Sequence, residues 1–405
     1  MVISCSWIKS FLNNGHLVRI YILLGVHCLA VSCSNDVKTT RDKREANTIN
    51  DLGALPTTYK EPPDNISNPA KIELGRMLFY DPILSGNRDV SCATCHHPEF
   101  GYAESLDISI GVNGRGIGHQ RSFAHPNDIP FTKRNSQTIL NTAFNGIDVQ
   151  GKYDPQNAPM FWDLRSKSLE LQALEPIKSF EEMRGHGAGP DSVLNMMVKR
   201  LKAIPEYHSL FEKAFGDRES ITIPNLGKAI ASFERSLVAN NSRFDLYMRG
   251  DSAALSTFEK DGLQVFLNAG CAKCHNGPML SDYNLHVLGV IDNEKLLQSD
   301  SGANNFYAFR TPSLRNLKYT SPYMHSGKLK TLENVLEFYE DLQGKDLPNP
   351  HVSRAQLDPL VKELDLEFKD IRLIVEFLNS LNDDQFDRKI PAKVPSGLKV
   401  GGEIQ

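Results

Sequence analysis

Apolar residues recur at helical spacing in several stretches of the chain. Residues 69–79 carry apolar side chains partly at intervals of three and four, and residues 256–266 repeat this pattern. Residues 191–215 and 223–237 are longer stretches of the same kind. Strict alternation of apolar and polar residues, which is typical of half-buried strands, is scarce. The pattern therefore predicts a mainly α fold with long loops.

The N-terminal part follows a different pattern. Residues 1–32 contain two basic residues and no acid, and their apolar run over 20–32 is too short to span a bilayer. This combination is typical of a signal peptide. Small residues precede Cys33, which predicts a lipoprotein signal with a lipidated Cys33; plain secretion and an uncleaved anchor are the alternatives. Residues 33–65 are polar and lack an apolar period, which predicts a flexible tether.

Length, charge and hydrophobic content indicate the number of domains and exclude some classes of protein. With 405 residues, the chain is long enough for two globular domains. The balance of 45 Lys+Arg against 49 Asp+Glu is slightly acidic, which argues against a protein that coats nucleic acid. A hydrophobic fraction of 40% without apolar runs near the length of a membrane span excludes a multi-span membrane protein.

Four of the seven cysteines form two copies of one motif. Both copies read Cys-x-x-Cys-His: Cys92, Cys95 and His96 in the first, and Cys271, Cys274 and His275 in the second. This is the attachment signature of c-type haem, in which two thiols bind the porphyrin and the histidine binds the iron. A disulfide would be the default in an exported protein. A redox-active pair or half of a zinc site is the other alternative, but neither explains a histidine after both pairs.

Each motif follows one of the predicted helices, so we expect two cytochrome-c-like domains that each carry one covalent haem c. The first covers residues 66–240 and the second residues 250–385, and residues 386–405 form a tail.

Further motifs extend beyond the cysteines. They are Arg-Asn-Ser at 134–136, Leu-Asn-Thr-Ala-Phe-Asn at 140–145, Phe-Trp-Asp-Leu-Arg at 161–165, Ala-Ser-Phe-Glu-Arg-Ser-Leu at 231–237, Phe-Arg-Thr-Pro-Ser-Leu-Arg-Asn at 309–316 and Pro-Tyr-Met-His-Ser-Gly at 322–327. With these motifs the chain resembles the bacterial di-haem cytochrome c peroxidases and their MauG-type relatives over about residues 66–385. The resemblance implies a peroxidase that reduces hydrogen peroxide to water, with a peroxidatic first haem domain and an electron-transfer second domain.

The resemblance implies that His96 binds the peroxidatic iron. Classical members carry a second, distal histidine sixteen residues later, and this position is Val112 here. Since valine cannot bind iron, we expect a five-coordinate iron that is open to peroxide, as in MauG-type relatives. His119 and His125 in the following loop are the alternative ligands.

Two polar residues match the distal pocket of the family. Glu182 lies twenty residues after Trp162 and matches the distal acid, and Gln172 lies ten residues after it and matches the distal amide. A buried carboxylate there can move a proton between the two peroxide oxygens, and burial would raise its pKa. The amide would orient peroxide. The alternative for Glu182 is a solvated loop acid, because its surroundings in the sequence are polar.

At the second haem, His275 is the expected proximal ligand. The resemblance implies that the sixth ligand lies fourteen residues after His325, which is Tyr339. Classical members have methionine there and MauG-type members tyrosine. Tyr339 also lies on an apolar helix stripe, so a core aromatic is the alternative, with Met324 or Met279 as the ligand.

Other residues are assigned by the resemblance alone. Trp162 matches the tryptophan between the haems and would carry electrons, or it is a plain core residue. Arg310 matches an arginine near the haems that would pair with a propionate. One Ca²⁺ is expected at Asn135, Thr320 and Pro322, through a side-chain oxygen and two carbonyls. The surface tryptophan that MauG-type enzymes carry just before the second motif is missing from this chain.

The expected partners are hydrogen peroxide, a small cytochrome c or cupredoxin as electron donor, an outer-membrane lipid anchor and a second copy of the chain in a homodimer. The expected location is the periplasm. Two other functions remain open. One is a MauG-type oxidase acting on a protein or small metabolite, and the other is a non-catalytic electron-transfer cytochrome.

Overall fold

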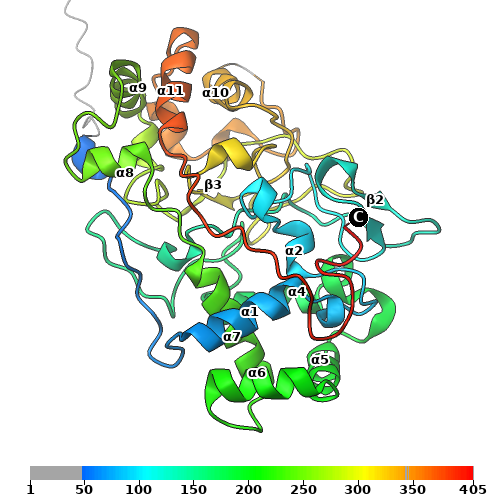
Figure 1. Ribbon diagram of the computed structural model, residues 1–405. Coiled ribbons are helices and arrows are strands. Elements are labelled where there is room, and N and C mark those ends of the chain that lie inside the picture. Colours follow the sequence, from blue (N-terminus) through cyan, green and yellow to red (C-terminus); the bar gives the residue numbers. More distant parts are fainter. Residues whose placement is uncertain (1–47, 343, 345, 405) are drawn as a thin grey trace, which may run out of the picture. The chain divides into compact units, whose positions relative to one another are not determined.

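The computed structural model describes residues 48–404 except 343 and 345, and it is mostly helical (Figure 1). The predicted signal peptide and Cys33 lie outside the described residues. The α-helices are α1 (Pro69–Tyr80), α2 (Cys92–Cys95), α3 (Leu169–Gln172), α4 (Glu175–Lys178), α5 (Val193–Lys202), α6 (Pro205–Phe215), α7 (Ile223–Ser236), α8 (Arg243–Met248), α9 (Thr257–Asn268), α10 (Leu332–Asp341) and α11 (Ile371–Asn379). The strands form two short antiparallel pairs, β1 (Gly114–Arg115) with β2 (Ser122–Phe123) and β3 (Leu285–His286) with β4 (Phe309–Arg310).

The predicted helices are confirmed. Helix α1 begins at Pro69, where the missing N–H costs nothing, and the side chain of Asn68 accepts a hydrogen bond from the Lys71 amide at 2.8 Å. Helices α7 and α9 match the stretches at 223–237 and 256–266. The stretch at 191–215 divides into α5 and α6 because Pro205 cannot continue a helix but is well suited to start one.

Two helix pairs frame the two haem motifs in the same way. Helix α1 packs on α7, and α9 packs on α11. Each contact is centred on a glycine. A Cβ at Gly75 would lie 2.0 Å from the Ala229 carbonyl oxygen, and one at Gly262 would lie 2.0 Å from the Leu373 carbonyl oxygen. Only glycine allows these backbones to approach so closely, so the two halves share one packing solution.

Two apolar clusters follow from these pairs. The first includes Leu74, Phe79 and Phe233 around α1 and α7, and the second includes Phe266 and Phe377 around α9 and α11. The described part of the chain forms a single compact unit, and its division into two cytochrome-c-like domains stays a prediction.

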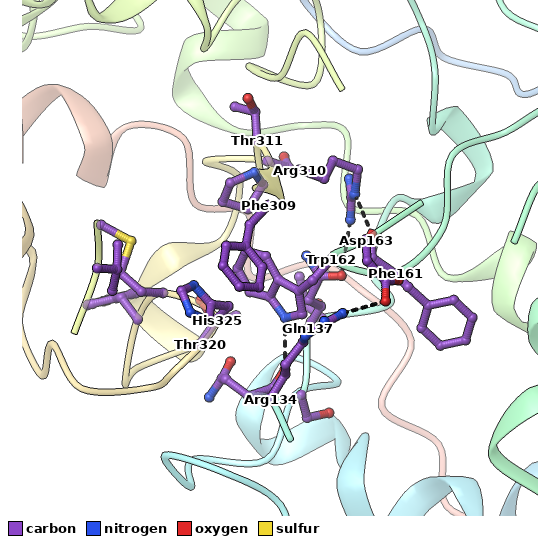
Figure 2. A pocket seen from close by; sticks show the side chains of 18 of the residues that line it. Arg134, Gln137, Phe161, Trp162, Asp163, Phe309, Arg310, Thr311, Thr320 and His325 are labelled. Carbon is purple, nitrogen blue, oxygen red and sulfur yellow. Dashed lines mark hydrogen bonds and ion pairs between the residues drawn. The ribbon is translucent and has the colours of Figure 1, made fainter. Parts of the chain in front are cut away.

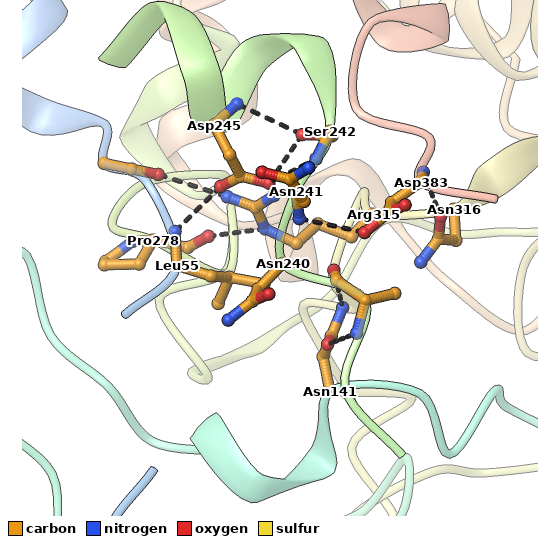
Figure 3. A network of polar contacts seen from close by, with 12 residues as sticks. Leu55, Asn141, Asn240, Asn241, Ser242, Asp245, Pro278, Arg315, Asn316 and Asp383 are labelled. Atoms are coloured by element: carbon orange, nitrogen blue, oxygen red, sulfur yellow. Dashed lines mark hydrogen bonds and ion pairs between the residues drawn. The ribbon is translucent and has the colours of Figure 1, made fainter. Parts of the chain in front are cut away.

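The segment expected to be a tether is packed where it is described. The Leu55 side chain is 1% exposed, and its amide donates to the Asp245 carboxylate at 2.8 Å. Arg315 donates to the Asp245 carboxylate at 2.9 Å and to the Gly53 carbonyl at 3.1 Å (Figure 3). Leu52 belongs to the second cluster. The prediction of a flexible tether is therefore wrong for residues 48–65, because this buried ion pair fastens the segment to the second half.

The predicted tail at 386–405 is likewise a packed segment over its described residues. After α11 the chain crosses to the first half and ends beside β2 (Figure 1). Phe386 and Val394 join the first cluster. The Thr94 hydroxyl donates to the Gly401 carbonyl at 2.8 Å, and the Gly401 amide donates to the Tyr80 carbonyl at 2.8 Å. The first half is therefore completed by the C-terminal segment, which supports the loop of the first haem motif.

Among the described residues, helices with the length and apolarity needed to cross a membrane are absent.

Candidate haem and peroxide site

A cavity of about 870 Å³ borders both Cys-x-x-Cys-His motifs. Its wall includes Cys95 and His96 from the first motif, and Cys271, Cys274 and His275 from the second. Cys92 packs against the first cluster instead. The four cysteines carry free thiols rather than disulfides. Residues nearly two hundred positions apart in the sequence thus meet around one cavity, whose size is in the range of small-molecule and cofactor sites.

Both motif histidines have the same orientation. The Nδ1 atom of His96 lies 3.0 Å from the Tyr102 carbonyl oxygen, and that of His275 lies 3.0 Å from the Leu280 carbonyl oxygen. A carbonyl accepts only from N–H, so the proton is on Nδ1 and the Nε2 lone pair is free. Burial lowers the pKa of both imidazoles and keeps them neutral. A neutral histidine fixed through its other nitrogen is the usual form of a metal ligand.

Glu182 and Gln172 both border the cavity. Gln172 is the last residue of α3, and Glu182 lies in a π-helical turn, Phe180–Arg184, of a type that is frequent at functional sites. Burial and, second, the neighbouring Glu181 raise the pKa of Glu182 to about 7. Glu182 is partly exposed and borders the cavity. This carboxyl can therefore release and take up a proton near neutral pH.

The loop that contains Val112 is hydrogen-bonded to the backbone of Glu182. Val112 is fully buried, and its amide donates to the Glu182 carbonyl at 3.0 Å. The valine thus fills core space and fixes the backbone of the acid. His119 and His125 are exposed and lie outside the cavity wall. In the described part of the chain, these alternative distal ligands are therefore not positioned to bind an iron at His96.

Tyr339 extends from α10 to the cavity near the second motif. Burial, followed by the thiols of Cys274 and Cys271, raises the pKa of its hydroxyl well above the usual value. The whole apolar stripe of α10 (Leu332, Val335, Leu336 and Tyr339) borders the cavity. Tyr339 can thus belong to the apolar stripe of its helix and also face the second motif. Met324 and Met279 also border the cavity.

Trp162 lies where the two halves meet (Figure 2). Its indole N–H donates to the Asn135 carbonyl at 3.0 Å, and its carbonyl accepts from the Arg310 amide at 2.7 Å. The His325 ring stands edge-on to the indole, with 6.3 Å between ring centroids, and is stacked on Phe309 at 3.5 Å. A continuous aromatic group therefore connects residues of the first half with β4 of the second.

Arg310 is a buried cation at the cavity wall. Its guanidinium donates to the Phe161 carbonyl at 2.9 Å and to the Gln137 side-chain oxygen at 3.1 Å, and burial lowers its pKa. Among the described residues it has no carboxylate partner. A haem propionate would supply this missing anion. Together with the two free Nε2 atoms and the thiols, the donor set of the cavity fits two haems.

The residues expected to bind Ca²⁺ all border the cavity: Asn135, Thr320 and Pro322. The Asn135 amide nitrogen donates to the Leu106 carbonyl at 2.8 Å, so its side-chain oxygen points away from that carbonyl. The calcium assignment itself remains a prediction.

Sequence reasoning missed two groups beside the motifs. Glu104 is 1% exposed, and within the described part of the chain neither carboxylate oxygen meets a partner at hydrogen-bond geometry. His286 lies between Asp282 and Asp358. Glu104 could have been noticed from its position in the loop after His96. The histidine cluster could not, because Asp358 comes from a distant segment of the chain.

Comparisons with known proteins agree with this site. A family described as di-haem cytochrome c peroxidase matches residues 69–253. The methylamine utilization protein MauG of Methylorubrum extorquens is 32% identical over 376 residues, which cover 89% of this chain and 92% of the relative. The cytochrome c551 peroxidase of Pseudomonas aeruginosa is 33% identical over 325 residues, covering 77% and 79%.

Solved structures show the same fold. A crystal structure of a MauG-like protein associated with microbial copper homeostasis is 28% identical, with a TM-score of 0.65 over 81% of this chain and 95% of that one. The diheme peroxidase BthA of Burkholderia thailandensis has a TM-score of 0.60 at 20% identity, covering 87% and 99%. From the paired motifs, the shared cavity and these relatives, it follows that the chain belongs to the di-haem cytochrome c peroxidase and MauG family.

Proposed function

We propose that the protein is a di-haem peroxidase that reduces hydrogen peroxide to water with electrons from a small redox protein. The observation that supports this proposal is one cavity that borders both haem motifs and also has Glu182 and Gln172 in its wall. A simple electron carrier has no need of a buried acid with a pKa of about 7 beside one motif.

Each motif would hold one haem c by thioether bonds, with His96 and His275 as proximal ligands. When bound, the haems supply an iron that binds peroxide at the first site and a store of electrons at the second. Arg310 would bind a propionate, since its buried guanidinium otherwise has only neutral partners in the described structure.

The side chains of the first site would transfer the proton and orient the peroxide. Glu182 as a carboxylate would take the proton of the peroxide oxygen nearer the iron and return it to the leaving oxygen, which then departs as water. Gln172 would hold the peroxide in line by hydrogen bonding. General acid–base transfer of this kind contributes rate factors of about 10²–10⁴. Trp162 would carry electrons between the halves.

The setting of the reaction follows from the leader and the motifs. We propose export to the periplasm, where haem c is attached, with Cys33 lipidated and the protein held at the outer membrane. The electron donor would be a small cytochrome c or cupredoxin. A Ca²⁺ ion at Asn135, Thr320 and Pro322 would join the two halves, and a homodimer is the proposed assembly.

A MauG-type oxidase is the second candidate. Two observations favour it: Val112 is buried where classical members have a distal histidine, and Tyr339 borders the cavity near the second motif. The absence from the sequence of a tryptophan just before Cys271 opposes long-range oxidation of a protein substrate.

Low-temperature electron paramagnetic resonance of the fully ferric protein, before and after hydrogen peroxide, tests the proposal when combined with turnover of a reduced small cytochrome c. A high-spin signal that reacts with peroxide, together with steady donor oxidation, is expected. Reaction with peroxide without donor turnover would favour the oxidase. Two low-spin signals that peroxide leaves unchanged, also in half-reduced protein, would leave only an electron carrier.

A further inference from the structure

A second charged group, unconnected with Glu182, lies beside the second motif. The Nδ1 atom of His286 is 2.7 Å from a carboxylate oxygen of Asp358, and its Nε2 atom is 3.0 Å from a carboxylate oxygen of Asp282. The three side chains are largely buried, with exposed fractions of 10% for His286, 11% for Asp282 and 19% for Asp358. We refer to these three residues as the histidine cluster.

The geometry requires a positive charge on His286. A neutral imidazole has one N–H, but here both ring nitrogens face carboxylate acceptors, so both must carry a proton. Although burial opposes the charge, the hydrogen bond with Asp282, the neighbouring Cys274 sulfur and the hydrogen bond with Asp358 raise the pKa of His286. Burial raises the pKa of Asp282, but the hydrogen bond that its carboxylate accepts from His286 lowers it, and the net shift is downward. The cluster thus places one imidazolium between two carboxylates.

The cluster lies directly against the second attachment site. The Asp282 amide donates to the Cys274 carbonyl at 2.8 Å. The Cys274 sulfur, an Asp282 oxygen and a His286 nitrogen all lie within 4.8 Å of one another. His286 also borders the cavity, and it pairs with Phe309 in the strand ladder that leads to Arg310. The charges therefore lie a short distance from whatever group occupies the cavity at Cys274.

A metal ion does not account for this cluster. Both nitrogens of His286 already donate to carboxylates, so no lone pair remains for a metal. In addition, a Cys274 thioether would lack the thiolate charge that makes cysteine a strong metal ligand.

We propose that His286, held between Asp282 and Asp358, is a fixed cation that sets the reduction potential of the haem attached at Cys271 and Cys274. This inference rests on the proposed function, because it requires a haem at the second motif. Reduction adds one electron from the donor to this haem. A nearby cation stabilises the reduced state and raises the potential, whereas each carboxylate lowers it, and both effects are strong in a low-dielectric interior. His286 is thus a positioning residue.

Two substitutions that change the cluster charge in opposite directions test the inference. His286→Gln removes the cation and leaves two carboxylates, so the potential of the second haem is expected to fall. Asp358→Asn removes one anion and leaves the His286–Asp282 pair, so this potential is expected to rise. Spectroelectrochemical titration of the purified protein with both haems measures each potential, and that of the first haem is expected to stay unchanged.

His186→Gln is the matched control, because His186 forms a surface pair with Asp128 at 2.9 Å, with exposed fractions of 65% and 74%. It should change neither potential. Shifts of the second haem in the same direction for both cluster variants, or no shift in either, would overturn the inference. If His286→Gln does not fold, the rise in Asp358→Asn decides alone. Intact-mass measurement counts the covalent haems, and a wild-type protein without a second haem would instead contradict the proposed function.

Discussion

The two halves of the molecule share a frame but differ in the charges around their haem motifs. In each half a glycine-centred helix pair supports a motif whose histidine binds a backbone carbonyl through Nδ1. Beside the first motif, burial raises the pKa of both Glu104 and Glu182 to about 7. Beside the second, the imidazolium of His286 is paired with two aspartates, and these bonds together with the Cys274 sulfur raise its pKa.

This difference matches a division of labour. Reduction of peroxide to water consumes protons as well as electrons, so the half that binds peroxide needs groups that gain and lose protons near pH 7. A half that only stores and passes electrons is better served by constant charges, since these keep its potential independent of pH. In the proposed function, one frame would thus support two kinds of site that differ in a few buried side chains.

The largest effect is expected for Glu182→Gln. The amide keeps the size of the side chain but cannot accept the peroxide proton, so turnover with hydrogen peroxide should fall by about 10²–10⁴-fold. Steady-state oxidation of a reduced small cytochrome c measures this. The potential of the second haem should not change.

Glu206→Gln, at an exposed position of α6, is the matched control and should keep wild-type turnover. A turnover rate for Glu182→Gln within about a factor of two of the control would show that Glu182 does not transfer the peroxide proton. The proposed contrast between a proton-exchanging first half and a second half with fixed charges would then fail.

The next largest effect, on stability, is expected when the segment around Leu55 loses its attachment to the second half. Asp245→Ala would leave Arg315 buried without its anion and the Leu55 amide without an acceptor. Loss of one partner of a buried pair costs about 3–5 kcal/mol. Denaturant unfolding can be followed by the absorption band of each haem. The band of the second haem should change at a lower denaturant concentration than in wild type. Asp261→Ala, at an exposed position of α9, controls for loss of an aspartate. A loss under about 1 kcal/mol would mean that the segment is held mainly by its apolar contacts.

The sequence predicted the helices well because their signals are local. Asn68 and Pro69 start α1, and Pro205 divides α5 from α6. The haem motifs are equally local. The packing of the segments at both ends was not predicted because it depends on distant partners. These are the Asp245–Arg315 pair for the first, and the Tyr80 carbonyl and the Thr94 hydroxyl for the second. Local sequence patterns do not predict contacts between residues that are far apart in the chain.

The candidate site shows the same limit. The roles of Glu182 and Gln172 were predicted only through resemblance, and the sequence around Glu182 is polar. Glu104 and the histidine cluster were not assigned at all. A buried acid is recognised by what surrounds it in space, and Asp358 meets His286 only after the chain has passed through α10.

A smaller effect, confined to the first half, is expected for Glu104→Gln. Burial raises the pKa of Glu104 from 4.5 to about 7. In the unfolded chain the acid ionises at lower pH, so its contribution to stability is fully present below pH 4.5 and is lost as pH rises through about 7. The variant removes this loss. It should resemble wild type at pH 5 and be more stable by about 2–3 kcal/mol at pH 8.

Thermal unfolding at the two pH values, on protein with both haems, measures this difference. Glu219→Gln, an exposed acid, should show none. Equal effects of Glu104→Gln at pH 5 and pH 8 would indicate a packing change rather than a titrating carboxyl.

The smallest effect on stability is expected for Tyr339→Phe in the second half. The ring stays on the apolar stripe of α10, and among the described residues its hydroxyl has no hydrogen-bond partner, so the free energy of unfolding should change by less than about 1 kcal/mol. If the oxygen binds the second iron, the absorption and paramagnetic resonance signals of that haem should change while those of the first remain. Unchanged signals at both haems would contradict ligation and make Tyr339 a core residue. In that case the electron-storing half would differ from the peroxide half through the histidine cluster, and Met324 or Met279 would be the next ligand to test.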